Sequence, residues 1–370
     1  MYIARAPQNI CTRSNSILNF DGDCFDIYLY ANSPYRHHDK RFVNGNVAPD
    51  ATKQIVGAIS GTTFTRPDTT SGFPAISCAL SVTGGATTAH AYERPAGGYP
   101  DSLSPTLKIG MFLPSTNTSM EAELWHILKR GAAGGDAEIN GVGIHAANVL
   151  TPKPDYSTPE AVAAYNNAFA AGLQITLKTL RLAEPQYLIM GMSFEGGNAG
   201  IAGVDALCQG VAKTCGMGLA TWQWAIKGAL ETMFPLAGRA TPLRVGLLSP
   251  FNESGNANAT AFFGSDHFPQ QEVPRSFSFS CATTVDIAHV PDDVKRAGVR
   301  ALVGGDKANP LVDCVVQCGT NCTLVHLADE LEQECGVPVL GVNAVLLWFA
   351  LRENGINGKI DGVGRLFREH

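Results

Sequence analysis

A pattern of strand and turn that occurs twice most constrains how this chain can fold. The segment 243–250, Leu-Arg-Val-Gly-Leu-Leu-Ser-Pro, repeats the apolar pattern and the final proline of 107–114, Leu-Lys-Ile-Gly-Met-Phe-Leu-Pro, at an offset of 136 residues (243 − 107). A second pair of apolar segments breaks at Gly191 and at Cys318, an offset of 127 residues (318 − 191). Because two similar offsets occur in the same order, we predict a duplicated α/β unit.

The run 312–322 shows how such a unit is built. Its first half is mostly apolar and β-branched, which is typical of a strand buried on both faces. After Gly319 the chain enters a segment with helical spacing, 322–332, which Thr320 or Asn321 could cap. Free N–H groups and the dipole at the start of a helix favour negative charge, so this turn predicts an anion-binding site. The alternative is a capped turn with no ligand.

Composition limits the class of protein. The chain has 370 residues, of which 45% are hydrophobic and 16% charged, so it is globular and long enough for two or more domains. A formal net charge of −6 argues against a nucleic-acid surface, and no apolar run reaches the roughly 18 residues that a membrane span needs. The N-terminus lacks the apolar core of a signal peptide, and the ten cysteines show neither a Cys-x-x-Cys pair nor zinc-ligand spacing. We therefore expect a reduced, cytoplasmic protein with no bound metal.

Residues 1–105 differ from the rest of the chain. They are rich in turn chemistry and contain two short apolar runs, 25–30 and 75–80, without the alternation of strands and helices that follows. We expect an irregular or β-rich N-terminal extension there. The rest should form two α/β lobes, 106–215 and 216–370, with a C-terminal helix that could return to the first lobe.

The predicted fold class is α/β, with two pseudo-symmetric lobes that carry mostly parallel sheets and a cleft between them. Polar turns follow four of the predicted strands, and ligands bind at the carboxyl ends of strands in such sheets. If the halves face each other, four turns converge on the cleft, at 114–119, 191–197, 249–256 and 318–322.

Five short motifs follow these strands in a consistent order and spacing: Pro114-Ser115-Thr116-Asn117-Thr118, Met190-Gly191-Met192-Ser193, Ser249-Pro250-Phe251, Cys318-Gly319-Thr320-Asn321, and Gly336-Val337-Pro338-Val339 followed by Asn343. In these motifs the chain from about Leu107 onward resembles the Asp/Glu racemase superfamily, in particular the branch of maleate cis-trans isomerase and arylmalonate decarboxylase. The resemblance implies that the protein works without a cofactor or a metal. It also implies that backbone and hydroxyl donors bind a carboxylate, while one or two cysteines move a proton or act as nucleophile at the adjacent carbon.

The chain departs from the family at its cysteines. Gly191 stands where the resemblance places the first cysteine, which disfavours a two-thiol racemase or isomerase and favours the decarboxylase branch. Two alignments remain for the position of the second family cysteine. One places Cys318 at that position as proton donor. The other places Gly319 at that position and turns Cys318 to the opposite face of its strand. Cys322, in the first turn of the predicted helix, is a lesser candidate, with core packing as its alternative role. Phe251 replaces a family tyrosine, so one hydroxyl donor is missing.

Further candidates lie in the same turns. Glu195 could act as a general base if burial raises its pKa, and its alternative is a solvated loop acid. His145 and His326 could donate protons. The predicted catalytic residues are therefore Cys318, Ser193, Glu195 and Cys322. The predicted substrate-binding residues are Asn117, Thr118, Gly191, Met192, Phe251, Gly319, Thr320, Asn321 and Asn343.

The resemblance and these residues together imply a cofactor-independent decarboxylase or cis-trans isomerase that acts next to the carboxylate of a small carboxylic or dicarboxylic acid. Decarboxylation is preferred, because stabilising an enediolate does not require two opposed bases. The alternative is a catalytically inactive carboxylate-binding protein of the same fold. We expect no nucleic-acid or membrane partner, and the chain could form a homo-oligomer.

Overall fold

The structure is a computed structural model and describes residues 101–150, 158–192, 200–235, 238–265, 268, 270–305 and 307–370, together with short strands between residues 2 and 88. The chain divides into two compact units, Met1–Gly98 and Tyr99–His370. The described residues of the first unit are paired antiparallel strands: β1 (Tyr2–Ile3) with β4 (Ile27–Tyr28), β2 (Leu18–Phe20) with β3 (Asp23–Phe25), β5 (Thr63–Thr65) with β6 (Ser77–Ala79), and β7 (Ser81–Thr83) with β8 (Ala86–Thr88).

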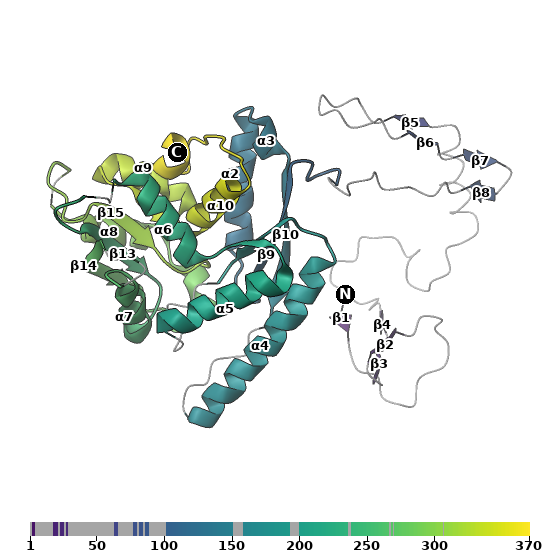
Figure 1. Ribbon diagram of the computed structural model, residues 1–370, viewed down its shortest axis with the longest axis horizontal. Coiled ribbons are helices and arrows are strands. Elements are labelled where there is room, and N and C mark those ends of the chain that lie inside the picture. The colour runs from purple at the N-terminus through teal and green to yellow at the C-terminus, as the bar shows by residue number, and fades with distance from the viewer. Residues whose placement is uncertain are drawn as a thin grey trace. The chain divides into compact units, whose positions relative to one another are not determined.

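The second unit contains two parallel sheets of four strands each (Figure 1). The first sheet has the order β10-β9-β11-β12, with β9 at Leu107–Pro114, β10 at Val142–Val149, β11 at Tyr187–Met190 and β12 at Gly218–Ala220. The second sheet has the order β14-β13-β15-β16, with β13 at Leu243–Ser249, β14 at Gln271–Ser278, β15 at Cys314–Gln317 and β16 at Val339–Gly341. The first sheet extends past residue 215, because β12 pairs with β11.

The two sheets have the same strand order, and their central strand pairs, β9 with β11 and β13 with β15, have the same register. Ile109 of β9 pairs with Tyr187 of β11, and Val245 of β13 pairs with Cys314 of β15. These partners differ by the two offsets that the sequence repeat predicts, 136 (245 − 109) and 127 (314 − 187). The prediction of an α/β fold with two similar halves and parallel sheets is therefore confirmed.

Helices connect the strands and cover the sheets. Their bounds are α2 (Met120–Ala133), α3 (Ala137–Asn140), α4 (Pro159–Arg181), α5 (Gly200–Cys215), α6 (Trp222–Met233), α7 (Glu253–Phe262), the short 3-10 helix η2 (Asp286–His289), α8 (Asp292–Val303), α9 (Val325–Cys335), α10 (Val342–Glu353) and α11 (Arg365–Glu369). In this unit α4 packs on β9 and β10, while α8 packs on β13, β14 and β15. None of the described helices combines the length and the apolar character that a membrane crossing needs.

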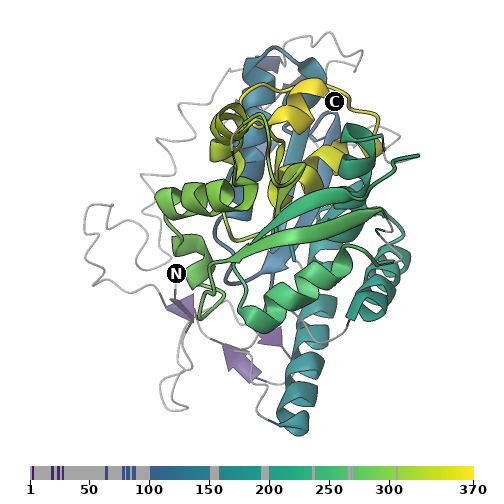
Figure 2. The ribbon, with the colours of Figure 1, turned by 90° about the vertical axis from the view of Figure 1, so that its left-hand side faces the viewer.

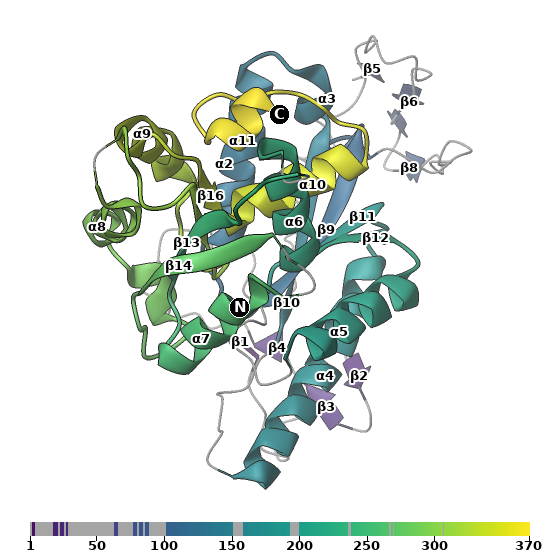
Figure 3. The same cartoon turned by 60° about the vertical axis from the view of Figure 1, so that its left-hand side comes forward.

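The two halves share a hydrophobic core. The largest cluster of buried side chains takes residues from both sheets and from α2, α6 and α10, whereas two smaller clusters cover the outer faces of the first and the second sheet. Helix α10 follows the last strand of the second sheet, yet it contacts α2, α6, β11 and β12 of the first half (Figure 3). The segment after α10 also lies against the first half (Figure 2), where Arg130 Nε donates to the carbonyl of Asp361 at 2.9 Å.

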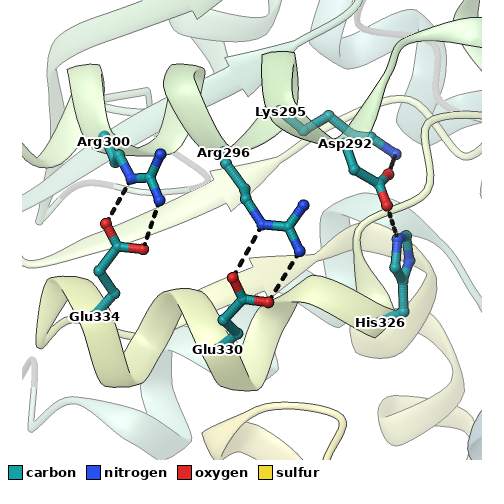
Figure 4. Close-up of polar contacts among 7 residues, drawn as sticks. All are labelled: Asp292, Lys295, Arg296, Arg300, His326, Glu330 and Glu334. Carbon is teal, nitrogen blue, oxygen red and sulfur yellow. Dashed lines mark hydrogen bonds and ion pairs between the residues drawn. The ribbon is translucent and has the colours of Figure 1, made fainter.

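A ladder of side chains joins α8 and α9 on the outside of the second sheet (Figure 4). His326 Nε2 lies 2.8 Å from Asp292 Oδ2, and two bidentate ion pairs follow, Arg296–Glu330 and Arg300–Glu334. Each pair spans 34 residues, which shows that the two helices run parallel and in register.

One local prediction in the second half is wrong. The helix predicted at 322–332 begins at Val325, and its N-cap is Leu324 without a side-chain bond, so neither Thr320 nor Asn321 caps it. The physical reason lies in a contact of the helix start with the first half, described below. Asn343, a predicted substrate-binding residue, lies in the first turn of α10, because β16 stops at Gly341.

Candidate active site

Asn117 links the carboxyl end of β9 to the second half. Its Oδ1 accepts from the N–H groups of Ser119 and Met120 at 3.1 and 3.0 Å, so the side chain caps the start of α2 and is held in one orientation. Its Nδ2 donates to Thr320 Oγ1 at 2.9 Å. Thr320 Oγ1 in turn donates to the carbonyl of Gly191 at 2.8 Å. Three strand-end turns, those after β9, β11 and β15, therefore meet at Thr320.

Asn321 forms a second link at the same place. Its Oδ1 accepts from the N–H of Thr118 at 3.0 Å, and its Nδ2 donates to the carbonyls of Thr116 and Thr284 at 3.1 and 3.0 Å. The predicted carboxylate donors Asn117, Thr320 and Asn321 are thus brought together, but these side-chain groups bond to the protein itself. They hold the two halves in contact, and the predicted cleft between the halves stays a prediction.

The turn after β13 reaches the same point through Gly319. A Cβ atom on Gly319 would lie 2.5 Å from Cγ of Pro250 and 3.8 Å from Cζ of Phe251, so the strand-end turns pack directly on each other. Gly319 also has a φ of +85°, which L side chains rarely adopt. Both observations require glycine at this position.

The backbone at 319–321 offers the donors that the side chains do not. Among the described residues, the N–H groups of Gly319, Thr320 and Asn321 donate no hydrogen bond. Successive N–H groups around a residue with positive φ form a concavity that binds anions. This backbone segment, which we call the 319–321 turn, is the part of the site best suited to a carboxylate.

Cys318 occupies in the second half the position that Gly191 occupies in the first. The N–H of Gly191 donates to the carbonyl of Phe112 at 2.7 Å, and the N–H of Cys318 donates to the carbonyl of Leu248 at 2.9 Å. The acceptors differ by 136 residues and the donors by 127, the same offsets that relate the sheets. The internal repeat therefore supports the alignment that equates Cys318, and not Gly319, with the position of Gly191.

The two equivalent positions differ in their surroundings. At Gly191 a Cβ atom would lie 2.7 Å from Sδ of Met120, 2.9 Å from Cβ of Leu113 and 3.1 Å from the carbonyl oxygen of Phe112. The neighbours of Gly191 thus fill the space that a side chain would need. Cys318 is fully buried in the core that both sheets share. One thiol is present at this pair of positions.

The remaining predicted residues are buried in the core, exposed, or outside the described residues. Cys322 is buried, and burial raises the pKa of its thiol to about 12, so the thiol stays protonated at neutral pH. The side chain of Met192 packs in the outer core of the first sheet. Ser193 and Glu195 lie outside the described residues. The two histidines are exposed, His145 on β10 and His326 in the ladder outside the second sheet.

Glu123 is the residue that the sequence analysis missed. Its Oε1 accepts from the N–H groups of Leu324 and Val325, both at 2.8 Å, and its Oε2 accepts from Nδ2 of Asn343 at 2.8 Å. Burial raises the pKa of this carboxyl group, and the three donors oppose that shift. The carboxyl group of Glu123 thus bonds to the first N–H groups of α9, so an external anion at this turn would have to bind to the N–H groups of 319–321, and the predicted anion site stays a prediction. The sequence held one signal: Glu123 falls within the apolar stripe of α2, three residues after Met120.

Solved structures of two kinds of enzyme have this fold, whereas no family model and no curated protein matches the chain. A maleate cis-trans isomerase of Nocardia farcinica, a mutant with a covalently bound succinylcysteine intermediate, is 21% identical with a TM-score of 0.57, over 71% of this chain and 99% of that one. A maleate isomerase of Pseudomonas putida S16 is 15% identical with a TM-score of 0.55, over 71% and 98%. Arylmalonate decarboxylase is 18% identical with a TM-score of 0.52, over 71% and 100%. From residue 107 onward the chain therefore has the two-sheet α/β fold of maleate cis-trans isomerase and arylmalonate decarboxylase, the fold that its motifs predicted.

Proposed function

We propose that this protein is a lyase that decarboxylates a small malonate-type dicarboxylic acid, with Cys318 as its single proton donor. The equivalence of Cys318 and Gly191 supports this reading most directly, because it leaves one thiol at the two related strand ends. The names of the structurally similar enzymes, maleate isomerase and arylmalonate decarboxylase, both refer to small dicarboxylic acids.

The proposed step needs one anion site and one acid. The bond between the central carbon and one carboxylate breaks, carbon dioxide leaves, and the electron pair forms an enediolate on the remaining carboxylate. The N–H groups of the 319–321 turn would bind that carboxylate and stabilise the developing charge. The thiol of Cys318 gives its proton to the carbon, and the thiolate takes a proton from solvent. A reaction that needs a second acid or base on the opposite face finds no side chain at Gly191.

The test is turnover of a panel of malonates and maleate, with detection of carbon dioxide and of the acid product. We expect product from a malonate, and no product with Cys318→Ala, which should still bind the substrate in a calorimetric titration. Cys322→Ala is the matched control and should turn over at close to the wild-type rate, because Cys322 lies after the 319–321 turn and at neither of the two equivalent strand ends. Full activity in Cys318→Ala would refute the assignment.

A second candidate is a carboxylate-binding protein without catalytic activity. It is favoured by one observation, namely that Asn117, Thr320 and Asn321 use side-chain donors between the two halves. In this case the 319–321 turn binds a carboxylate, and no reaction follows. It predicts that malonate binds with the same affinity to the wild type and to Cys318→Ala, and that neither forms product.

A further inference from the structure

Glu123 takes no part in the proposed chemistry, yet its carboxylate is buried where the two halves of the second unit meet. It belongs to α2 of the first half and is 7% exposed. Its donors, the N–H groups of Leu324 and Val325 and the side chain of Asn343, all belong to the second half. Both carboxyl oxygens act as acceptors, so this one side chain joins the start of α9 to Asn343.

Asn343 extends the contact to the 319–321 turn. The same Nδ2 group that donates to Glu123 also donates to the carbonyl oxygen of Thr320 at 2.9 Å. That carbonyl and the N–H of Asn321 belong to one peptide group, which is planar. Holding the oxygen therefore fixes the direction of the Asn321 N–H, one of the three unbonded donors of the turn.

The start of α9 holds the other end of the segment. Glu123 Oε1 accepts from Leu324 and Val325, three and four residues after Asn321. The N–H of Cys322 donates to the carbonyl of Gly319 at 2.9 Å. This bond forms a turn between the Thr320 carbonyl, which Asn343 holds, and the start of α9, which Glu123 holds. One carboxylate thus fixes both sides of the turn that carries the free N–H groups.

We propose that Glu123 is a positioning residue: through Asn343 and the start of α9 it aims the N–H groups of the 319–321 turn at the carboxylate of a bound ligand. This inference rests on the proposed function of the same turn. It assigns to Glu123 no contact with the ligand and no proton transfer.

A substitution by glutamine tests the charge and the acceptor pattern with little change in shape. The amide oxygen of Glu123→Gln can still accept from the start of α9, but its NH2 group then faces Nδ2 of Asn343, which is also a donor. Two donors cannot bond to each other, so Asn343 must turn away and lose its hold on Thr320. Glu121→Gln is the matched control, because Glu121 lies on the same helix and is exposed.

The experiment compares amide hydrogen exchange in the full-length wild type and in both glutamine variants. Within 318–325 the amides of Cys318, Cys322, Leu324 and Val325 donate hydrogen bonds, and we expect their exchange to become about tenfold faster or more in Glu123→Gln, while the reference strand 107–113 and all of Glu121→Gln stay as in the wild type. In parallel, calorimetry with malonate should show affinity about tenfold weaker in Glu123→Gln only. Asn343→Ala should weaken affinity similarly, and the double variant should be no weaker than the single ones, because both changes break one chain of contacts.

Two results would overturn the inference. One is wild-type exchange within 318–325 in Glu123→Gln, together with wild-type malonate affinity. The other is equal acceleration in 318–325 and in 107–113, which would mean that Glu123 only stabilises the fold. If the wild type neither binds nor turns over malonate or maleate, the proposed function fails, and the exchange comparison still decides whether Glu123 positions the turn.

Discussion

Replacing Asn321 by alanine should loosen the contact between the two halves of the second unit. The side chain accepts one hydrogen bond, from Thr118, and donates two, to Thr116 and Thr284. Two of these three partners belong to the first half. Asn321 is 6% exposed, so the partners that it leaves behind have little access to water.

The expected cost follows from those three bonds. A typical intramolecular hydrogen bond contributes about 0.5–1.5 kcal/mol, and buried groups left without a partner raise the loss toward the upper end. The free energy of unfolding should therefore fall by about 3 kcal/mol. For a unit of this size 1 kcal/mol changes the melting temperature by about 2–4 °C, so the shift should be roughly 6–12 °C.

Tryptophan fluorescence during urea unfolding is a suitable assay. All four tryptophans, Trp125, Trp222, Trp224 and Trp348, lie in the second unit, so the signal reports on that unit alone. Asn357→Ala is the matched control, because this exposed asparagine makes one local bond, to the carbonyl of Gly355. We expect the control to stay within about 0.5 kcal/mol of the wild type. If Asn321→Ala does the same, the idea that Asn321 holds the halves together is refuted.

Four further outcomes are expected. Gly191→Ala should lower the free energy of unfolding by about 1–3 kcal/mol, because its Cβ would lie 2.7 Å from Sδ of Met120; an unchanged melting temperature would show that Met120 moves aside freely. Burial raises the pKa of Glu332 to about 7, above its ordinary value, so the stability that this group contributes is complete at low pH and lost as pH rises through about 7. Relative to Glu332→Gln, the wild type should thus lose unfolding free energy between about pH 5 and 8 in urea titrations, and parallel pH profiles would contradict this. Arg300→Ala breaks an exposed ion pair with Glu334 and should cost less than about 1 kcal/mol in the same assay. Chelators should leave any turnover unchanged, since the described residues bring together no group of three His, Cys, Asp or Glu side chains that could hold a metal; loss of activity that one divalent ion restores would argue otherwise.

The repeat in the sequence predicted the fold well, because strand patterns are local. The apolar runs at 107–113 and 243–249 lie in β9 and β13, and the offset between them equals the offset in the structure. Local signals misplaced the start of α9, since its cap comes from Glu123 of the first half and not from the neighbouring Thr320 or Asn321. No pattern within the segment could reveal that partner.

The sequence indicated that Asn117, Thr320 and Asn321 lie together but not how their side chains bond. That Asn117, Thr320 and Asn321 lie close together follows from two halves whose strand ends face each other, which the repeat in the sequence can indicate. Whether their amide and hydroxyl groups face a ligand or each other depends on distances of a few ångströms between two separate halves. The structure shows that they bond across the halves and leaves the free donors on the backbone of the 319–321 turn.

The bond between Glu123 and the start of α9 also bears on how the chain folds. Leu324 receives its acceptor from a residue 201 positions earlier, so the start of α9 gains this bond only when α2 has docked against it. Closing so long a loop costs chain entropy before the contact stabilises anything, which slows folding and favours an all-or-none transition. Each half has a complete sheet of its own, and yet each holds only one side of this buried contact. A chain cut between the two repeats would leave one fragment with a buried acid and the other with the donors for it.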